Sequence, residues 1–263
     1  MSRIFPAVMA ALLLGSSMSN AAATPAERLG EAIRFKTVSH QDRSLIDLEE
    51  LRRFNEFLRA SFPRVFTQLE VETVNDFSLL IRWPGSDPNL QPILFTAHMD
   101  VVPIEPGTAD DWEHPPFAGV VSDGRIYGRG TLDNKQGLLG NLEAAESLLA
   151  EGFVPARTIV FAFGHDEEIS GKQGAGKIAE LMRAKGWHFD WMVDEGGMLM
   201  SDNSLLPDKT LAIINVAERV TSRLRSQPQA RAATPPGRRK SVPSGDSLRR
   251  WRVLSRTHSR HAL

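Results

Sequence analysis

The chain has 263 residues, of which 41% are apolar and 24% charged, so it has the composition of an ordinary globular protein with enough apolar material for a buried core. The absence of cysteine excludes a thiol nucleophile, a cysteine-based zinc site and any disulfide. The net charge of -1 conceals an uneven distribution, because residues 219–263 hold 12 of the 31 Lys and Arg residues and one of the 32 acids.

Residues 1–23 have the pattern of an export signal. Arg3 supplies a positive charge, an apolar run extends from Phe5 to Gly15, and mostly small residues follow up to Ala23. Such a segment is cleaved during export, here after Ala22 or Ala23. The alternative is an uncleaved membrane anchor, but the apolar run is short for a bilayer span. We therefore expect an exported protein, periplasmic or secreted, without a stable membrane span.

Helical and strand patterns alternate over residues 24–218. A helix start is expected at Thr24-Pro25, and further helices over residues 48–62, 138–149 and 175–185. The expected strands cover residues 65–74, 77–83, 93–97, 158–163, 189–193 and 210–216. Pro- and Gly-rich residues 101–126 are expected to be irregular. The pattern predicts an α/β domain with a mixed, largely parallel sheet flanked by helices.

Residues 219–263 are rich in Arg, Ser and Pro and lack a periodic apolar pattern. Such a segment cannot bury enough surface to offset the entropy of ordering it, so we expect a disordered basic tail. Its charge would suit nucleic acid or anionic lipid. It has no interleaved aromatic residues and no recognisable binding module, so we do not expect a nucleic-acid partner.

His98 and Asp100 directly follow the apolar strand expected over residues 93–97. Residues two apart in an extended chain point the same way, so Asp100 can orient the His98 ring and leave one nitrogen for a metal ion. The alternative is a buried histidine that is hydrogen-bonded to its neighbour and binds nothing.

Asp133 lies just before an expected helix, in the segment from Gly128 to Lys135. Asp is a favoured helix N-cap, which is the structural interpretation of this residue. A carboxylate can instead bridge two cations through its two oxygens. The sequence leaves both interpretations open at this point.

Two further acidic clusters follow apolar strands. The segment from His165 to Glu168 follows the strand over residues 158–163, and Asp194-Glu195 follows the strand over residues 189–193. The alternatives are a solvated acidic loop and a turn. Adjacent glutamates diverge, so one can bind metal while the other handles an attacking water. This mixture of His, Asp and Glu suits zinc, with manganese or cobalt as further candidates. The sequence has no H-E-x-x-H motif and no G-x-S-x-G motif, so it supports neither a zincin nor an α/β-hydrolase serine nucleophile.

Taken together, these motifs resemble the two-zinc metallopeptidase family twenty, which includes aminoacylases, acetylornithine deacetylase, succinyl-diaminopimelate desuccinylase and carboxypeptidase S. The resemblance covers about residues 25–218 and is carried by residues 95–103, Trp112, Pro116-Phe117, residues 123–130, Asp133, residues 135–137, Glu167-Glu168 and residues 194–197. It implies a zinc-peptidase-like catalytic domain that cleaves amide bonds of peptides or N-acyl amino acids through a water activated by two zinc ions.

The resemblance also implies a role for each site residue. His98 and Asp194 bind one zinc ion, Glu168 binds the other, and Asp133 bridges both. Asp100 orients His98, and Glu167 is the general base.

The resemblance fades near Arg219, where family members insert a lid domain that often dimerises and then add final strands and a last His ligand. From this we expect that the lid and final strands are missing, that a frameshift produced residues 219–263, and that the sheet has an unpaired edge. We further expect this chain to hydrolyse little or no substrate. The alternative function is a non-catalytic remnant that binds one metal ion or none.

Overall fold

A computed structural model describes residues 23–201, 204, 206 and 209–214 of the chain. The expected export signal lies, except for Ala23, outside the described residues, and so does the expected basic tail over residues 219–263. Among the helices that are described, none is long and apolar enough to cross a membrane.

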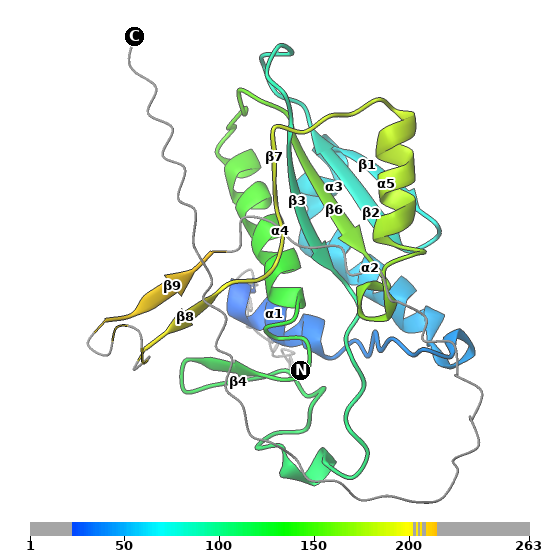
Figure 1. The fold of residues 1–263 in the computed structure, drawn as a ribbon, viewed down its shortest axis with the longest axis vertical. Coiled ribbons are helices and arrows are strands. Elements are labelled where there is room, and N and C mark those ends of the chain that lie inside the picture. Colours follow the sequence, from blue (N-terminus) through cyan, green and yellow to red (C-terminus); the bar gives the residue numbers. More distant parts are fainter. Residues whose placement is uncertain (1–22, 202–203, 205, 207–208, 215–263) are drawn as a thin grey trace, which may run out of the picture. The chain divides into compact units, whose positions relative to one another are not determined.

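Five strands form a mixed sheet in the order β1-β2-β6-β3-β7 (Figure 1). They are β1 (Glu70–Val74), β2 (Ser78–Trp83), β6 (Ile159–Gly164), β3 (Ile93–His98) and β7 (Trp191–Val193). β3 is parallel to both β6 and β7, whereas β2 is antiparallel to both β1 and β6. The expected mixed sheet is confirmed, and its three mutually parallel strands are the ones that precede the acidic clusters.

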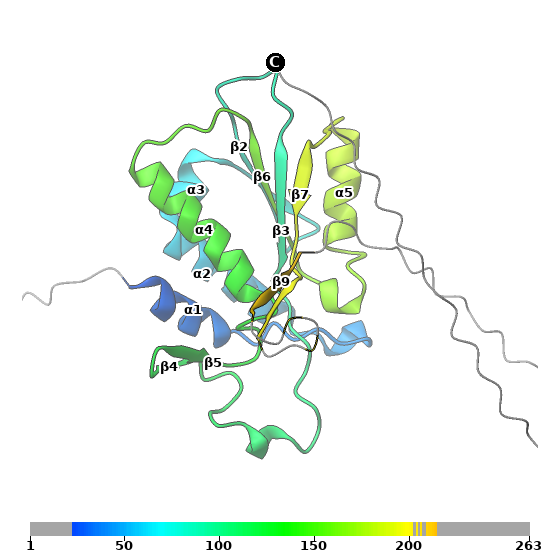
Figure 2. The same ribbon diagram turned by 60° about the vertical axis from the view of Figure 1, so that its left-hand side comes forward.

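Helices cover both faces of this sheet (Figures 1 and 2). α2 (Leu48–Ser61), α3 (Pro63–Gln68) and α4 (Lys135–Ala150) lie on one face, and α5 (Ala175–Ala184) lies on the other. α1 (Pro25–Ile33) packs on α4. The expectation of an α/β sheet flanked by helices is therefore confirmed.

Alternation along the strands builds two hydrophobic cores. In β2, Leu79 and Ile81 point into the core beneath α2 and α4, whereas Leu80 points into the core beneath α5. All three are at most 2% exposed. Full burial of such a side chain stabilises the fold by about 1.5–3 kcal/mol. Successive side chains of the strand thus point to opposite faces of the sheet, and each face packs against its own layer of helices.

The expected helix start at Thr24 is confirmed by its hydrogen bonds. The Thr24 side chain accepts a hydrogen bond from the Glu27 amide at 3.3 Å, and the Thr24 amide donates to Glu27 Oε2 at 2.7 Å. This reciprocal pair satisfies two amides that a helix N-terminus would otherwise leave without partners. Pro25 at the first helical position adds a backbone already restricted to helical φ.

The prediction of a strand over residues 65–74 was wrong in its first half. Residues 63–68 form α3, and β1 begins only at Glu70. Pro63 ends α2 as expected, but proline is also favoured at the first position of a helix, and here it starts the next one. Val65 is fully buried, which is consistent with an apolar residue on the inner side of a short helix.

Two hairpins lie outside the main sheet. β4 (Val120–Ser122) pairs with β5 (Arg125–Tyr127) in a segment that we expected to be irregular. Asp123 and Gly124 between them have φ values of 51° and 72°, as a two-residue hairpin turn requires. The strand expected over residues 210–216 is β9 (Leu211–Ile213), and it pairs with β8 (Met198–Met200).

Three short 3-10 helices are also present among the described residues: η1 (Arg43–Leu45), η2 (Ala109–Asp111) and η3 (Glu167–Ile169).

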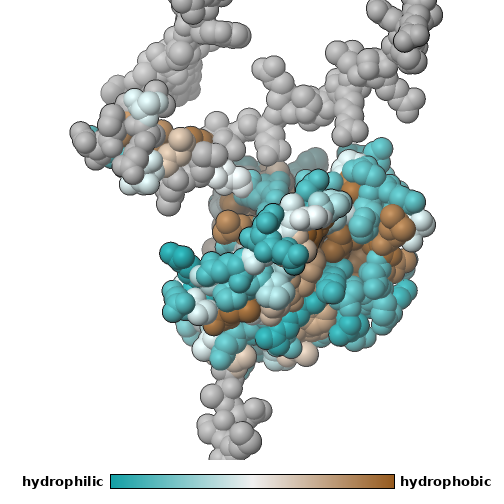
Figure 3. Space-filling model, turned by 90° about the horizontal axis from the view of Figure 1, so that it is seen from below, coloured by the Kyte–Doolittle hydropathy of each residue, from teal (hydrophilic) through white to brown (hydrophobic). Residues whose placement is uncertain are grey.

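β7 lies at one edge of the sheet as far as the described residues show, and its residues Trp191, Met192 and Val193 are each more than 40% exposed. The face of the molecule in Figure 3 is mostly polar, with apolar residues between the polar ones. A strand edge without a neighbour can pair with another chain.

Candidate metal centre

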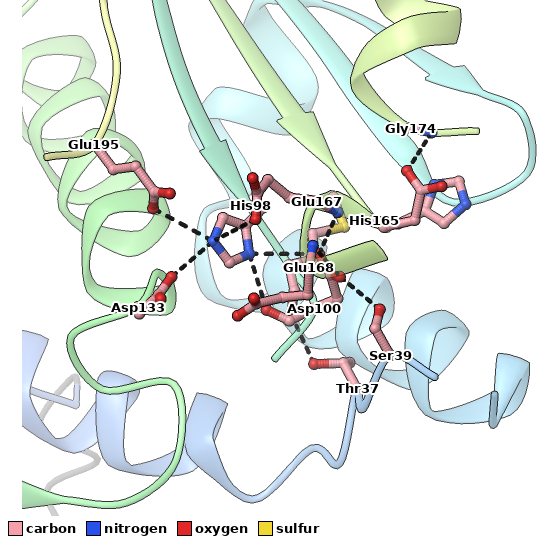
Figure 4. A network of polar contacts seen from close by, with 12 residues as sticks. Thr37, Ser39, His98, Asp100, Asp133, His165, Glu167, Glu168, Gly174 and Glu195 are labelled. Carbon is pink, nitrogen blue, oxygen red and sulfur yellow. Dashed lines mark hydrogen bonds and ion pairs between the residues drawn. The ribbon is translucent and has the colours of Figure 1, made fainter. Parts of the chain in front are cut away.

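Strand register brings the first two acidic clusters together. β3 and β6 run parallel with His98 opposite Gly164, so the residues that follow both strands emerge at the same edge of the sheet. Asp133 arrives at this edge from the loop before α4, and Glu195 arrives from the segment after β7 (Figure 4). The carboxyl edge of parallel strands is the usual position of a site in open α/β sheets.

The hydrogen bonds of His98 determine which ring nitrogen faces the site. Its Nδ1 lies 2.9 Å from the backbone carbonyl oxygen of Asp100. A carbonyl oxygen only accepts hydrogen bonds, so Nδ1 carries a proton. The Asp100 carboxylate lies slightly farther from Nδ1, at 3.4 Å. Nε2 is therefore the nitrogen available for a metal ion, as expected when a second-sphere group fixes the tautomer.

Carboxylates surround Nε2 of His98. Asp133 Oδ1 lies 2.8 Å away, Glu195 Oε2 lies 3.3 Å away, and Glu167 Oε2 lies 3.9 Å away. His98, Asp133 and Glu195 each offer a donor atom within 4.8 Å of the other two (Figure 4). His98 is 2% exposed, so one side of the group is dry while the carboxylates reach toward solvent.

Asp100 is a buried carboxylate that receives several hydrogen bonds. Ser39 Oγ donates to its Oδ2 at 2.5 Å, and the amides of Glu167 and Glu168 donate to Oδ1 and Oδ2 at 3.0 and 3.2 Å. Burial raises the pKa of Asp100, but hydrogen bonds from His98 and Ser39 outweigh it and hold the pKa below its usual value. Asp100 is therefore ionised and contacts both His98 and the turn that carries the two glutamates.

Asp133 does not cap the following helix. The N-cap of α4 is Asn134, which makes no side-chain capping bond, and the Asp133 side chain is 66% exposed and bonded to His98. The peptide bond between Asp133 and Asn134 is cis. The Asp133 carboxylate faces the site through its contact with His98, and its charge adds to the effect of burial in raising the pKa of Glu168.

Glu167 and Glu168 lie on η3, directly beyond β6. Glu168 Oε1 is buried and has no hydrogen-bond partner in the described structure. Burial and the nearby Asp133 carboxylate raise the pKa of Glu168 to about 7. Burial also raises the pKa of Glu167. A buried oxygen without a partner is costly, and a bound cation would relieve that cost.

The four residues from His165 to Glu168 form two pairs with different roles. His165 Nδ1 contacts Ser78 Oγ at 2.7 Å, away from the carboxylates. The buried Asp166 accepts hydrogen bonds from the amides of Gln173 and Gly174 and from Arg43. A Cβ on Gly174 would lie 2.8 Å from Asp166 Oδ1, so glycine permits this close approach. His165 and Asp166 therefore hold the turn, while Glu167 and Glu168 face the site.

The fourth cluster places Glu195, and not Asp194, beside His98. Asp194 is exposed, accepts a hydrogen bond from the Glu195 amide at 2.9 Å, and is absent from the group of donor atoms found among the described residues. Its charge still raises the pKa of Glu167 and of Glu195, so it lies in the same acidic neighbourhood. The sequence pattern named both residues but could not distinguish them, because adjacent carboxylates at a strand end look alike in the sequence.

Lys135 ties the site to α1. It is fully buried at the start of α4, and its Nζ donates to the carbonyl oxygens of Ala32 and Phe35 at 2.9 and 2.7 Å. Its Nζ also lies 4.7 Å from the centre of the Phe54 ring. Burial lowers the pKa of Lys135 to about 7. The loop that presents Asp133 is thus anchored to the C-terminal end of α1.

The residues of this site fit a divalent cation. One imidazole nitrogen faces several carboxylates, and a buried Glu168 oxygen has no partner in the described structure. The mixture of nitrogen and carboxylate donors suits zinc and also manganese or cobalt. The fold and the site together define the class: an α/β protein with a candidate metal-binding site at the carboxyl edge of its sheet.

Comparison with known proteins gives the family. The model of "Peptidase family M20/M25/M40" matches residues 94–233, more than half of the chain. The chain belongs to this family, which confirms the resemblance found in the sequence. N-fatty-acyl-amino acid synthase/hydrolase PM20D1 of Bos taurus is 42% identical over 195 residues, or 73% of this chain and 38% of that protein. Carboxypeptidase S of Saccharomyces cerevisiae is 40% identical over 167 residues, or 60% and 29%.

Solved structures show the same fold. Human carnosine dipeptidase 1 superposes with a TM-score of 0.54 and 24% identity over 68% of this chain and 38% of that chain. A metallo-carboxypeptidase of Sulfolobus solfataricus has a TM-score of 0.53 and 21% identity over 66% and 37%. The chain thus spans less than half the length of the curated relatives given above.

The charge of His98 gives a testable pH dependence of stability. Burial lowers the pKa of His98, but the hydrogen bond to Asp100 and the charges of Asp100, Glu195 and Glu167 outweigh burial and raise it to about 10 without a cation. A group whose pKa is raised by folding stabilises the fold below its unfolded pKa, and that contribution is lost as the pH rises through the folded value. The stabilisation from His98 is thus complete below pH 6.5 and lost by about pH 10.

We expect the difference in unfolding free energy between wild type and His98→Gln, both freed of metal, to decrease from pH 6.5 to 10. Urea unfolding at several pH values measures it. Lys135, whose pKa burial lowers to about 7, acts in the opposite direction in both proteins, so its effect cancels from the difference. A difference that stays constant or grows over this range would contradict the assignment.

Proposed function

We propose that this chain has the site of a metal-dependent hydrolase that cleaves the amide bond of peptides or N-acyl amino acids. The observation that carries the proposal is the convergence of His98 Nε2 with carboxylates from three separate segments at the carboxyl edge of the sheet. This arrangement places negatively charged carboxylates around His98 Nε2, where a cation could bind, and the carboxylates remain accessible from solvent.

We propose zinc as the ion, with cobalt or manganese as alternatives. His98 and Asp194 would hold one ion, Asp133 would bridge, and Glu168 would hold the second. Support comes from His98 Nε2, which faces the carboxylates, from the exposed Asp133 carboxylate, and from the buried Glu168 oxygen that has no hydrogen-bond partner among the described residues. In the described arrangement Glu195 stands beside His98, where its charge contributes to the raised pKa of His98.

Substitution of the adjacent acids Asp194 and Glu195 tests this ligand set. We expect Asp194→Asn to weaken zinc binding by more than the about 10- to 100-fold typical of second-sphere changes, and Glu195→Gln to weaken it less. Competition with a chromogenic chelator measures both affinities. The reverse order would identify Glu195 as the ligand and overturn the assignment of Asp194.

Metal ions held by these residues would supply an acidified water and would polarise the substrate carbonyl. The chain's own residues then manage the proton. Glu167 is 51% exposed and has a pKa raised by burial, as suits a group that takes a proton from water and returns it to the leaving nitrogen. Asp100 orients the His98 ring from behind, through its backbone carbonyl oxygen and its carboxylate.

Relatives suggest the substrate class. The names N-fatty-acyl-amino acid synthase/hydrolase and carboxypeptidase S belong to proteins that are at least 40% identical over the matched residues. Both names concern an amide bond to an amino acid, so we propose peptides and N-acyl amino acids as substrates here. Each relative is more than twice as long as the match, so the activity of the whole relative remains a proposal for this chain.

Among the described residues, the proposed ligands of the second ion are the carboxylates of Asp133 and Glu168. Two donors hold an ion more loosely than three, so we expect slow turnover on a panel of dipeptides and N-acyl amino acids assayed with zinc. We expect Glu167→Gln to reduce any measured rate by about 10²- to 10⁴-fold, the usual contribution of a general base. Its zinc content should stay at the wild-type level. A rate near the enzyme median of about 10 s⁻¹, or an active Glu167→Gln variant, would contradict this description.

A second candidate function is a non-catalytic protein that binds one metal ion or none. This alternative is favoured by the observation that only two described residues, Asp133 and Glu168, are proposed as ligands of the second ion. Counting bound zinc by mass spectrometry under native conditions distinguishes the two: two tightly held ions favour the hydrolase, and one or none favours the alternative.

We also propose that residues 24–218 form part of a catalytic domain and that the protein is exported, with cleavage after Ala22 or Ala23. The confirmed helix start at Thr24 supports the first point, because a capped helix begins directly after the proposed cleavage site. N-terminal sequencing of the exported protein tests the second. A protein that retains Met1 at its N-terminus would contradict it.

A further inference from the structure

The Asp100 carboxylate lies between the two halves of the site. Its Oδ1 lies 3.0 Å from the Glu167 amide and 3.4 Å from His98 Nδ1. Its Oδ2 lies 3.2 Å from the Glu168 amide. One 1%-exposed carboxylate therefore fixes the position of the imidazole at the end of β3 relative to the turn that carries both glutamates after β6 (Figure 4).

Ser39 holds this carboxylate from the opposite side. Its hydroxyl donates to Asp100 Oδ2 at 2.5 Å, the shortest hydrogen bond that Asp100 makes among the described residues, and Ser39 is itself 3% exposed. The hydroxyl has little freedom to leave, because the Ser39 amide donates to the Val101 carbonyl oxygen at 3.0 Å. A bridge between Val38 and Val101 aligns the segment parallel to the chain beyond β3.

From this geometry we propose that Ser39 is a positioning residue of the site. It fixes the rotation of the Asp100 carboxylate, so that one group orients His98 and anchors the amides of Glu167 and Glu168 together. The proposal rests on the proposed function for its meaning in catalysis. The positioning itself is a property of the metal-free chain and can be measured without zinc or substrate.

The reason lies in the distribution of donors over the two oxygens. A carboxylate has about four lone-pair directions, and here each oxygen faces two donors. Without the Ser39 hydroxyl, Oδ2 keeps the Glu168 amide at 3.2 Å as its described donor. The carboxylate can then rotate, and the hydrogen bonds to both glutamate amides lengthen while the backbone of β3 stays in place.

The same segment offers a matched control. Thr37 is also buried, at 2% exposure, and its hydroxyl also donates a short hydrogen bond, at 2.7 Å. Its acceptor is the backbone oxygen of Met99 and not the carboxylate of Asp100. Thr37→Val therefore removes a buried hydroxyl of the same kind from the same bridge and leaves the Asp100 carboxylate with all its donors.

Hydrogen exchange in the metal-free protein tests the proposal. We expect Ser39→Ala to speed exchange of the Glu167 and Glu168 amides by about tenfold relative to the Ala162 amide of β6, the factor expected for loss of a hydrogen bond to a charged group. We expect Thr37→Val to change this ratio less than about twofold. Global destabilisation speeds exchange of the core-strand Ala162 amide at least as much as exchange of the turn amides, so it cannot by itself raise this ratio.

Zinc affinity gives a second measurement. We expect Ser39→Ala to weaken zinc binding by about 10- to 100-fold, as loss of an outer-sphere partner does, and Thr37→Val to leave it nearly unchanged. Selective acceleration of the two glutamate amides in Ser39→Ala supports the positioning role even if no substrate is hydrolysed. Equal effects of the two variants on the exchange ratio, or no effect of Ser39→Ala, would overturn it.

Discussion

The parallel pairing of β3 with β6 is the constraint on which the site depends. The register that sets His98 opposite Gly164 brings an imidazole and two glutamates to one edge, although about seventy positions separate them in the sequence. Buried residues on both faces of these strands fix that register, because a shift by one residue would exchange the faces of every side chain. Hydrophobic packing thus determines the geometry of a polar site.

The site concentrates partly buried carboxylates in a small volume, and their pKa values reflect burial first and the neighbouring negative charges second. The pKa values of Glu167, Glu168 and Glu195 are raised, and so is the pKa of His98. All four shifts favour the form with more protons, and therefore with more positive charge, as expected where cations are favoured. The chain carries a local excess of negative charge that the fold alone leaves uncompensated.

Sequence patterns predicted the strands, the flanking helices and the positions of the acidic clusters, because these depend on periodicity and on which residues follow a buried strand. They did not predict α3, since Pro63 ends one helix and also starts another. They could not separate Glu195 from Asp194, because the choice between neighbouring carboxylates depends on side-chain direction. Ser39 was missed because no local pattern links it to Asp100, sixty-one positions away.

The buried ammonium of Lys135 has a consequence for the smallest stable fragment of this protein. From the first turn of α4 it donates to the Ala32 carbonyl oxygen in the last turn of α1 and to the Phe35 carbonyl oxygen just beyond that helix. Deletion of α1 would leave a desolvated cation in an apolar interior without its Ala32 acceptor, at a cost of several kcal/mol. α1 is thus an integral part of the fold, and we expect a shortened chain to need α1 in order to retain the loop that presents Asp133.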